Sequence, residues 1–147
     1  MNILQIGIMI FAIIEVGNVM MLYFMPESKM GNGVGVFNAW EASKQDENVH
    51  ELVKYLVYWV AGAKLIFIMM GIVVIVWGSF LVQLLTVVAL IISIASFFWR
   101  LFPMIRRLDK KEQITPKGYS KTLMLMIAAF IVGFLVVLIV GFVQYLA

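Results

Sequence analysis

Four long apolar stretches dominate the chain, and their length predicts helices. They cover residues 3–24, 55–77, 79–99 and 123–146. Each has about 20 residues or more, which is enough for a helix to cross a hydrocarbon core of about 30 Å. Glu15 and Lys64 are the two charged residues within them. We therefore predict an all-α integral membrane protein, folded as a four-transmembrane-helix antiparallel bundle.

Capping signals extend these stretches into longer helices. Asn48 followed by Glu51 fits a capping box at the start of the second helix. Thr115 and Pro116 suit a cap and a first helical position for the fourth. The sequence thus predicts one membrane domain over 1–147. Its helices are expected at about 3–24, 49–77, 79–112 and 116–146, with loops at about 25–48 and 103–121.

Composition agrees with this membrane class. The chain is 64% hydrophobic and 13% charged, with a mean hydropathy of +1.05, whereas soluble domains are about 45–50% apolar and about 25% charged. It contains no cysteine, which excludes thiolate chemistry and cysteine-based zinc or iron–sulfur sites. The net charge of +3 does not indicate nucleic-acid binding, because the cations gather beside the apolar stretches. We expect no cofactor.

The distribution of lysine and arginine predicts the orientation. Ten of the eleven cationic residues lie in segments 25–54 and 100–122, and neither terminus nor the short connection at Gly78 carries one. Lysine and arginine accumulate in cytoplasmic loops. We therefore expect a multi-pass protein of the cell membrane, an inner membrane in a bacterium, with its N- and C-termini facing away from the cytoplasm.

The two charges within the spans fall at matching depths. Glu15 lies eight residues before Tyr23, or about 12 Å, and Lys64 lies nine residues after Tyr55, or about 13.5 Å. An unpaired charge at this depth is costly, so we predict an ion pair between consecutive helices. Asn18 follows Glu15 by three residues and shares its helix face.

The third span carries a seam of small and polar residues. Thr86, Ala89, Ser93, Ser96 and Arg100 recur at spacings of three and four, which places them on one helix face. Such a seam is typical of close helix packing. It is also compatible with a polar cavity beside the ion pair. The candidate binding site is therefore Glu15, Asn18, Lys64, Ser93, Ser96 and Arg100.

The loop after the first span has two features of interest. A short helix over 34–44 would carry Phe37 and Trp40 on one side, either in the headgroup interface or packed back under the bundle. The second feature is a group of acidic residues around His50, the one histidine. Acidic residues are favoured at a helix start. We expect no metal site there and, with so few acid–base groups, no enzyme.

Two functions fit these residues. The first is a transporter or permeation subunit for a small solute, with an anion as the solute that the site suits best. It would use the Glu15 and Lys64 site and act as a homo-oligomer. The alternative is a non-catalytic structural or accessory membrane protein that binds a partner protein or anionic lipid. The expected lipid contacts are Arg106, Arg107, Lys110 and Lys111.

Overall fold

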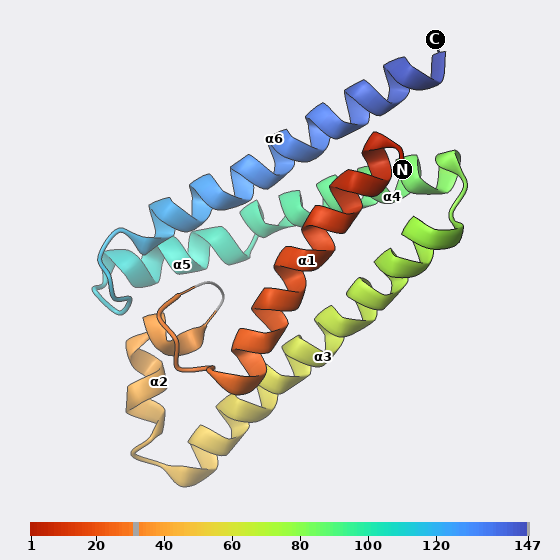
Figure 1. The fold of residues 1–147 in the computed structure, drawn as a ribbon. Coiled ribbons are helices and arrows are strands. Elements are labelled where there is room, and N and C mark those ends of the chain that lie inside the picture. The colour runs from red at the N-terminus through yellow and green to blue at the C-terminus, as the bar shows by residue number, and fades with distance from the viewer. Residues whose placement is uncertain (31–32, 147) are drawn as a thin grey trace.

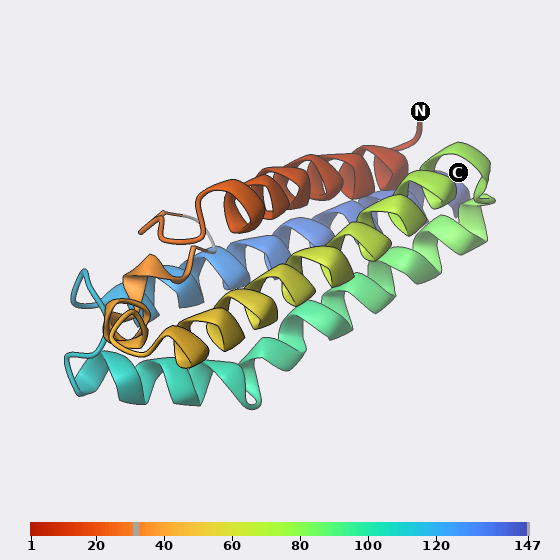
Figure 2. The same ribbon diagram turned by 90° about the horizontal axis from the view of Figure 1, so that it is seen from below.

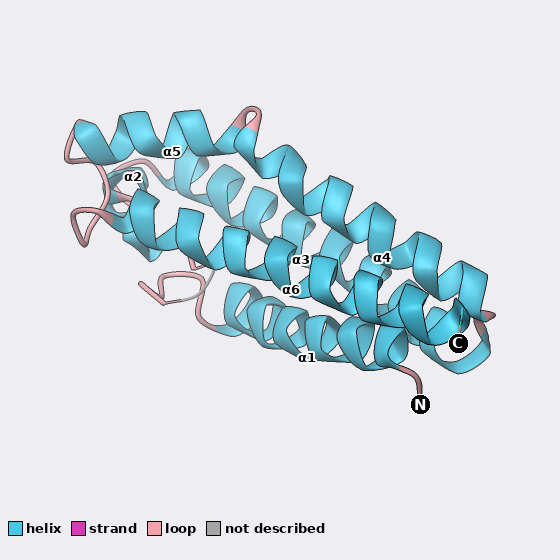
Figure 3. Cartoon of the chain, turned by 90° about the horizontal axis from the view of Figure 1, so that it is seen from above, coloured by secondary structure: helices cyan, strands magenta, loops and turns pink. Residues whose placement is uncertain are grey.

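The structure, a computed structural model, describes residues 1–30 and 33–146, and all regular secondary structure in these residues is helical (Figure 3). Four helical segments are long and apolar enough to cross a membrane. They are α1 (Ile3–Phe24), α3 (Glu47–Trp77), a third span that comprises α4 and α5 (Phe80–Lys110), and α6 (Tyr119–Leu146). The predicted all-α class with four apolar helices is confirmed.

The third span is interrupted where the sequence predicted one helix. α4 (Phe80–Ala95) ends in a 3-10 turn, η2 (Ser96–Phe98), and α5 (Leu101–Lys110) follows after a short loop (Figure 3). Pro103 explains the break, because it has no N–H to donate to the carbonyl of Trp99 and its ring clashes with that group. Within α5 itself, Pro103 falls in the first turn, where proline is tolerated.

Two helices begin at other positions than the capping signals indicated. α3 is capped by Asp46, whose carboxylate accepts hydrogen bonds from the backbone N–H groups of Asn48 and Val49 at 3.0 and 3.3 Å. α6 begins at Tyr119, after a turn in which Gly118 has a φ of +86°. An aspartate serves as well as an asparagine in a cap, so the sequence signal for α3 was displaced by two residues.

The helices associate as two pairs. α1 packs along α3, and α4 packs along α6. Figure 1 shows both termini and the α3–α4 connection at one end of the molecule, the terminal end, and the longer loops at the other, the loop end. The pairs meet at the terminal end and diverge toward the loop end (Figure 1), while in the view from below all four long helices run in similar directions (Figure 2).

Three clusters of buried residues hold this arrangement. One joins α1 to α3, the second joins α1, α4 and α6 near the terminal end, and the third lies under the loops. Their buried members are, in that order, Val19, Leu22, Val57, Ala61 and Ile68; Leu4, Ile8, Val87 and Phe134; and Val36, Ile105 and Ile114.

The first loop packs between the two helix pairs at the loop end. It forms a 3-10 turn, η1 (Val34–Val36), and a short helix, α2 (Asn38–Ser43). Phe37 makes an antiparallel β-bridge with Ile114, flanked by backbone hydrogen bonds of 3.0 and 2.8 Å. Trp40 is buried, with its ring 4.8 Å from that of His50. Of the two alternatives for segment 34–44, the structure has the one that packs against the bundle.

Candidate functional site

Glu15 and Lys64 form the predicted ion pair, between α1 and α3. Lys64 Nζ contacts Glu15 Oε2, and the side-chain amide of Asn18 donates to Glu15 Oε1 at 3.2 Å. Both carboxylate oxygens therefore have a partner. The two side chains are largely enclosed, with 16% of Glu15 and 25% of Lys64 accessible. The predicted pairing of Glu15 with Lys64 is confirmed.

The packing of α1 against α3 explains why this pair forms. Val57, Ala61, Lys64 and Ile68 recur at spacings of four and three, so they share one face of α3. Ala61 is completely buried there, and its small side chain lets the helices approach one turn away from Lys64. The ion pair is thus one layer of an otherwise apolar interface. Removing one partner would leave an unpaired charge within this apolar interface. If α1 and α3 cross a membrane, as their length and composition allow, such a charge costs about 2.5–3.5 kcal/mol.

The other three predicted site residues lie on a different surface. Ser93, Ser96 and Arg100 are exposed, whereas the face of α4 that packs into the bundle carries Gln83 and Val87. The structure therefore does not bring these three residues together with the ion pair. Because all three are exposed, they do not form a packed helix seam within the described residues of one chain.

Two of the three hydroxyl groups of the seam, those of Thr86 and Ser96, donate to nearby backbone carbonyls. Ser96 Oγ donates to the carbonyl of Ser93 at 2.6 Å, and Thr86 Oγ1 donates to the carbonyl of Val82 at 2.7 Å. The Arg100 guanidinium lies 5.7 Å from the centre of the Trp99 ring. These groups consequently need no partner from another helix to be tolerated at an exposed position.

The acidic segment around His50 has a structural explanation. His50 Nδ1 lies 2.8 Å from Ser43 Oγ, which ties the start of α3 to α2. Among the described residues there is no group of three or more histidine, cysteine or acidic side chains placed to hold a metal ion. Nearby, the hydrogen bond from Lys44 to Glu41 raises the pKa of Lys44 above its ordinary value, and Glu27 adds to the effect.

The basic helix α5 has two distinct faces. Ile105 is buried against the loops, and Leu101 and Met104 are exposed beside it, which makes one side apolar. The opposite side carries Arg106, Arg107 and Lys110, followed by Lys111 just after the helix, and all four are exposed. No acidic side chain of the described residues forms a salt bridge with any of these four. Such a helix is suited to a membrane surface.

Sequence reasoning missed a group of amides at the terminal end. Gln83 is almost completely buried in α4. Its side-chain oxygen accepts from Asn2 Nδ2 at 2.7 Å, and its nitrogen donates to the carbonyl of Gly78 at 2.8 Å. Gln5 donates to the carbonyl of Ile75 at 2.8 Å. These residues fasten the start of α1 to the α3–α4 connection. The position of Gln83, a polar side chain within an apolar stretch, was the sequence feature that could have indicated this group of amides.

Comparison with protein-family models, with curated proteins and with solved structures finds no match for this chain.

Proposed function

We propose that this chain is a non-catalytic accessory protein of the membrane, which binds anionic lipid headgroups through α5. One observation carries the proposal: the four cations of the α5 segment are exposed and unpaired among the described residues, on the side opposite its apolar face. Juxtamembrane cations of this kind are attracted to anionic lipids by about 1 kcal/mol each.

The buried charges support the accessory function over transport. Glu15 is satisfied by Lys64 and Asn18. The remaining residues of the predicted solute site, Ser93, Ser96 and Arg100, are exposed on the third span. In this proposal the ion pair fixes the register of α1 against α3. A homo-oligomer, which the sequence predicts, stays a prediction.

The proposed topology follows from the same cations. We infer an antiparallel bundle in the cell membrane whose loop end faces the cytoplasm, so that α5 meets the negatively charged cytoplasmic leaflet. The N- and C-termini then face away from the cytoplasm. The position of ten of the eleven cations in the loop-end segments 25–54 and 100–122 supports this orientation.

The lipid assignment is tested by thermal stability in detergent with added phospholipid. Phosphatidylglycerol should raise the melting temperature of the wild type by several degrees more than phosphatidylcholine does, because ligands stabilise the state that they bind. The double variant Arg106→Gln/Arg107→Gln should lose most of this difference. The matched control is Lys29→Gln/Lys121→Gln, which removes two exposed loop-end cations outside α5. An equal loss in the control would contradict a site on α5.

Variants of the ion pair separate the accessory function from transport. Glu15→Gln and Lys64→Met should each lower the folded yield, and the double variant should recover most of it, because replacing both buried charges costs little. In proteoliposomes with entrapped pH- and chloride-sensitive dyes, none of these proteins should conduct protons or chloride. A wild type that conducts, together with folded variants that do not, would favour transport instead.

A further inference from the structure

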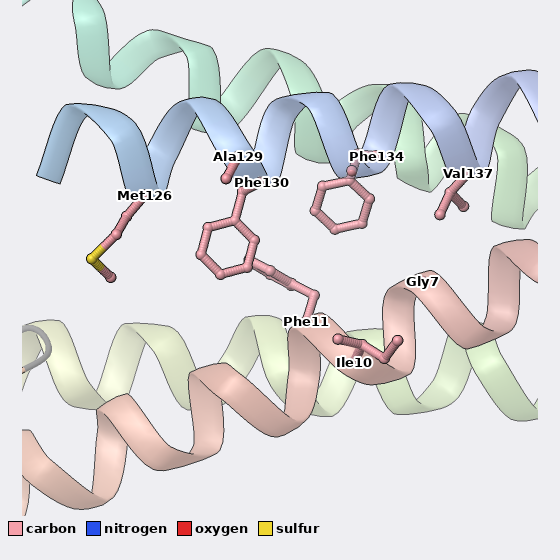
Figure 4. Close-up of a pocket in the computed structure, with 9 residues that line it drawn as sticks. Gly7, Ile10, Phe11, Met126, Ala129, Phe130, Phe134 and Val137 are labelled. Atoms are coloured by element: carbon pink, nitrogen blue, oxygen red, sulfur yellow. The ribbon is translucent and has the colours of Figure 1, made fainter. Parts of the chain in front are cut away.

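A groove of about 380 Å³ lies between α1 and α6, in the apolar part of both helices (Figure 4). Phe11 contributes its ring, which packs edge-on against Phe130 and Phe134 at centroid distances of 6.0 and 5.5 Å. Ala129 and Gly133 make the hollow, because neither fills the space beside these rings. The volume falls in the range of about 300–1,000 Å³ that is typical of small-molecule sites.

The groove is closed at the terminal end and opens toward the loop end. A Cβ atom on Gly7 would lie 2.9 Å from Val137 Cγ1, and one on Gly141 would lie 2.8 Å from Leu4 Cδ2, so α1 and α6 are in close contact there. Toward the loop end the two helices diverge (Figure 1). The first loop packs between the helix pairs beyond that point, so an elongated ligand would enter from the open side of the groove.

The dimensions of the groove favour a single hydrocarbon chain. Its α6 wall runs from Met126 to Val137, which spans about 16.5 Å along the helix axis. An extended hydrocarbon chain can lie along a groove of this length, and the apolar lining suits it.

Charge indicates the leaflet and the headgroup of the lipid. The groove opens toward the end of the molecule that carries ten of the eleven cations, and the terminal end carries none. Its lining residues are all apolar, so specificity for a headgroup must come from outside the groove. A phospholipid whose chain lies along the groove, with its headgroup toward the loop end, places its phosphate at the level of those cations.

We propose that the α1–α6 groove holds one acyl chain of an anionic phospholipid from the leaflet at the loop end. This inference rests on the proposed function for the preference for an anionic lipid, since the loop end carries the cations. α5 itself lies on the side of the bundle away from α1 (Figure 3), so the groove is a second lipid site. The bound chain lies between α1 and α6.

Filling the groove with a side chain tests the proposal. A Cβ atom on Gly133 would meet nothing within 4 Å, so Gly133→Phe places its ring in the groove without a backbone clash. Gly17 is equally open and does not line the groove, which makes Gly17→Phe the matched control. Ala129→Phe is a second groove variant, in case the first fails to fold.

The readout is native mass spectrometry of the full chain in detergent, with phosphatidylglycerol or phosphatidylcholine added. The wild type and Gly17→Phe should each retain one phosphatidylglycerol. Either groove variant should lower that retention by about tenfold or more, which corresponds to one order of magnitude in affinity. A change of oligomeric state in the groove variants, without a change in bound lipid, would instead indicate a second copy of the chain and would overturn the proposal.

The outcomes distinguish this inference from the proposed function. If the groove variants retain phosphatidylglycerol as the wild type does, the groove site is overturned, while a loss in Arg106→Gln/Arg107→Gln would still uphold headgroup binding at α5. If the groove variants lose both phospholipids equally and the charge variant behaves as the wild type, two claims fail. The groove then has no preference for an anionic lipid, and α5 does not bind an anionic headgroup.

Discussion

At the scale of single residues, glycines decide where α1 and α6 touch. Gly7 faces Val137 and Gly141 faces Leu4, each at a separation that leaves no room for a methyl group. Small residues are common at such crossings in membranes, where close packing replaces the hydrophobic effect as the driving force between helices. From these contacts toward the loop end, α1 and α6 separate, and this separation creates the groove between them.

A methyl group at Gly7 should therefore destabilise the protein. Gly7→Ala puts Cβ 2.9 Å from Val137 Cγ1, and we expect a loss of about 1–3 kcal/mol, as is typical of overpacking. The double variant Gly7→Ala/Val137→Ala should recover part of this loss. Thermal unfolding in detergent measures both effects.

Gly17 provides the control for that variant, because a Cβ there meets nothing within 4 Å. Gly17→Ala should leave the melting temperature unchanged or raise it slightly, since alanine is the better helix former by about 0.5–1 kcal/mol. A similar loss of stability in both alanine variants would show that the contact with Val137 is not the cause.

At the scale of secondary structure, Asp109 connects two helices at the loop end. It lies near the end of α5, and its carboxylate accepts hydrogen bonds from the backbone N–H groups of Gly118 and Ser120, at 2.9 and 3.0 Å, and from Ser120 Oγ at 2.5 Å. It thus caps the start of α6 from a distant position in the sequence. A negative charge there also complements the dipole of α6.

Removing this cap should weaken the loop end. We expect Asp109→Ala to lower the free energy of unfolding by about 1–2 kcal/mol, the range measured for helix caps, and to speed amide hydrogen exchange at the start of α6. Glu112→Ala is the control, because its ion pair with Lys117 is exposed and such pairs contribute about 0–1 kcal/mol. Equal effects of the two variants would argue against a capping role.

At the scale of the whole molecule, the two helix pairs meet at the terminal end and are bridged by the first loop where they diverge. The amides of Asn2 and Gln83 join α1 to α4 at the terminal end. At the loop end, the β-bridge between Phe37 and Ile114 joins the first loop to the segment after α5. The α1–α6 groove lies between these two connections, where the proposed acyl chain would lie.

The proposed orientation of the whole molecule is testable by labelling, because the chain contains no cysteine. Gln113→Cys places a thiol at the exposed loop end, and Ser79→Cys places one at the exposed terminal end. In intact cells a membrane-impermeant maleimide should label Ser79→Cys and leave Gln113→Cys unlabelled until the membrane is opened. The reverse pattern would contradict a cytoplasmic loop end.

Much of the fold was predictable because charges are rare in it. Two opposite charges at equal depth had few other ways to be tolerated, so the pairing of Glu15 with Lys64 followed from spacing and cost alone. The orientation of α4 did not follow. The small and polar residues of its seam favoured an inward face by their pattern, yet Ser93 and Ser96 lie on the exposed side, while Gln83 and Val87 turn inward.

Contacts that depend on loop geometry could not be predicted from the sequence either. Asp109 reaches the start of α6 because the chain turns back between them, and no local spacing announces that contact. The same holds for the bond between Asn2 and Gln83, which are far apart along the chain. Local sequence patterns predicted the helices. The contacts that join the helix ends could be identified only once the helices were placed relative to one another.

The ion pair between α1 and α3 also bears on how the protein is made. Translation delivers Glu15 to the membrane well before Lys64, so the first span arrives with a carboxylate that has no partner. Insertion of one charge at the centre of a span costs about 2.5–3.5 kcal/mol on scales from the translocation machinery. The first span is therefore expected to stay beside that machinery until the second emerges, so that both enter the bilayer as one hairpin with its charges already joined.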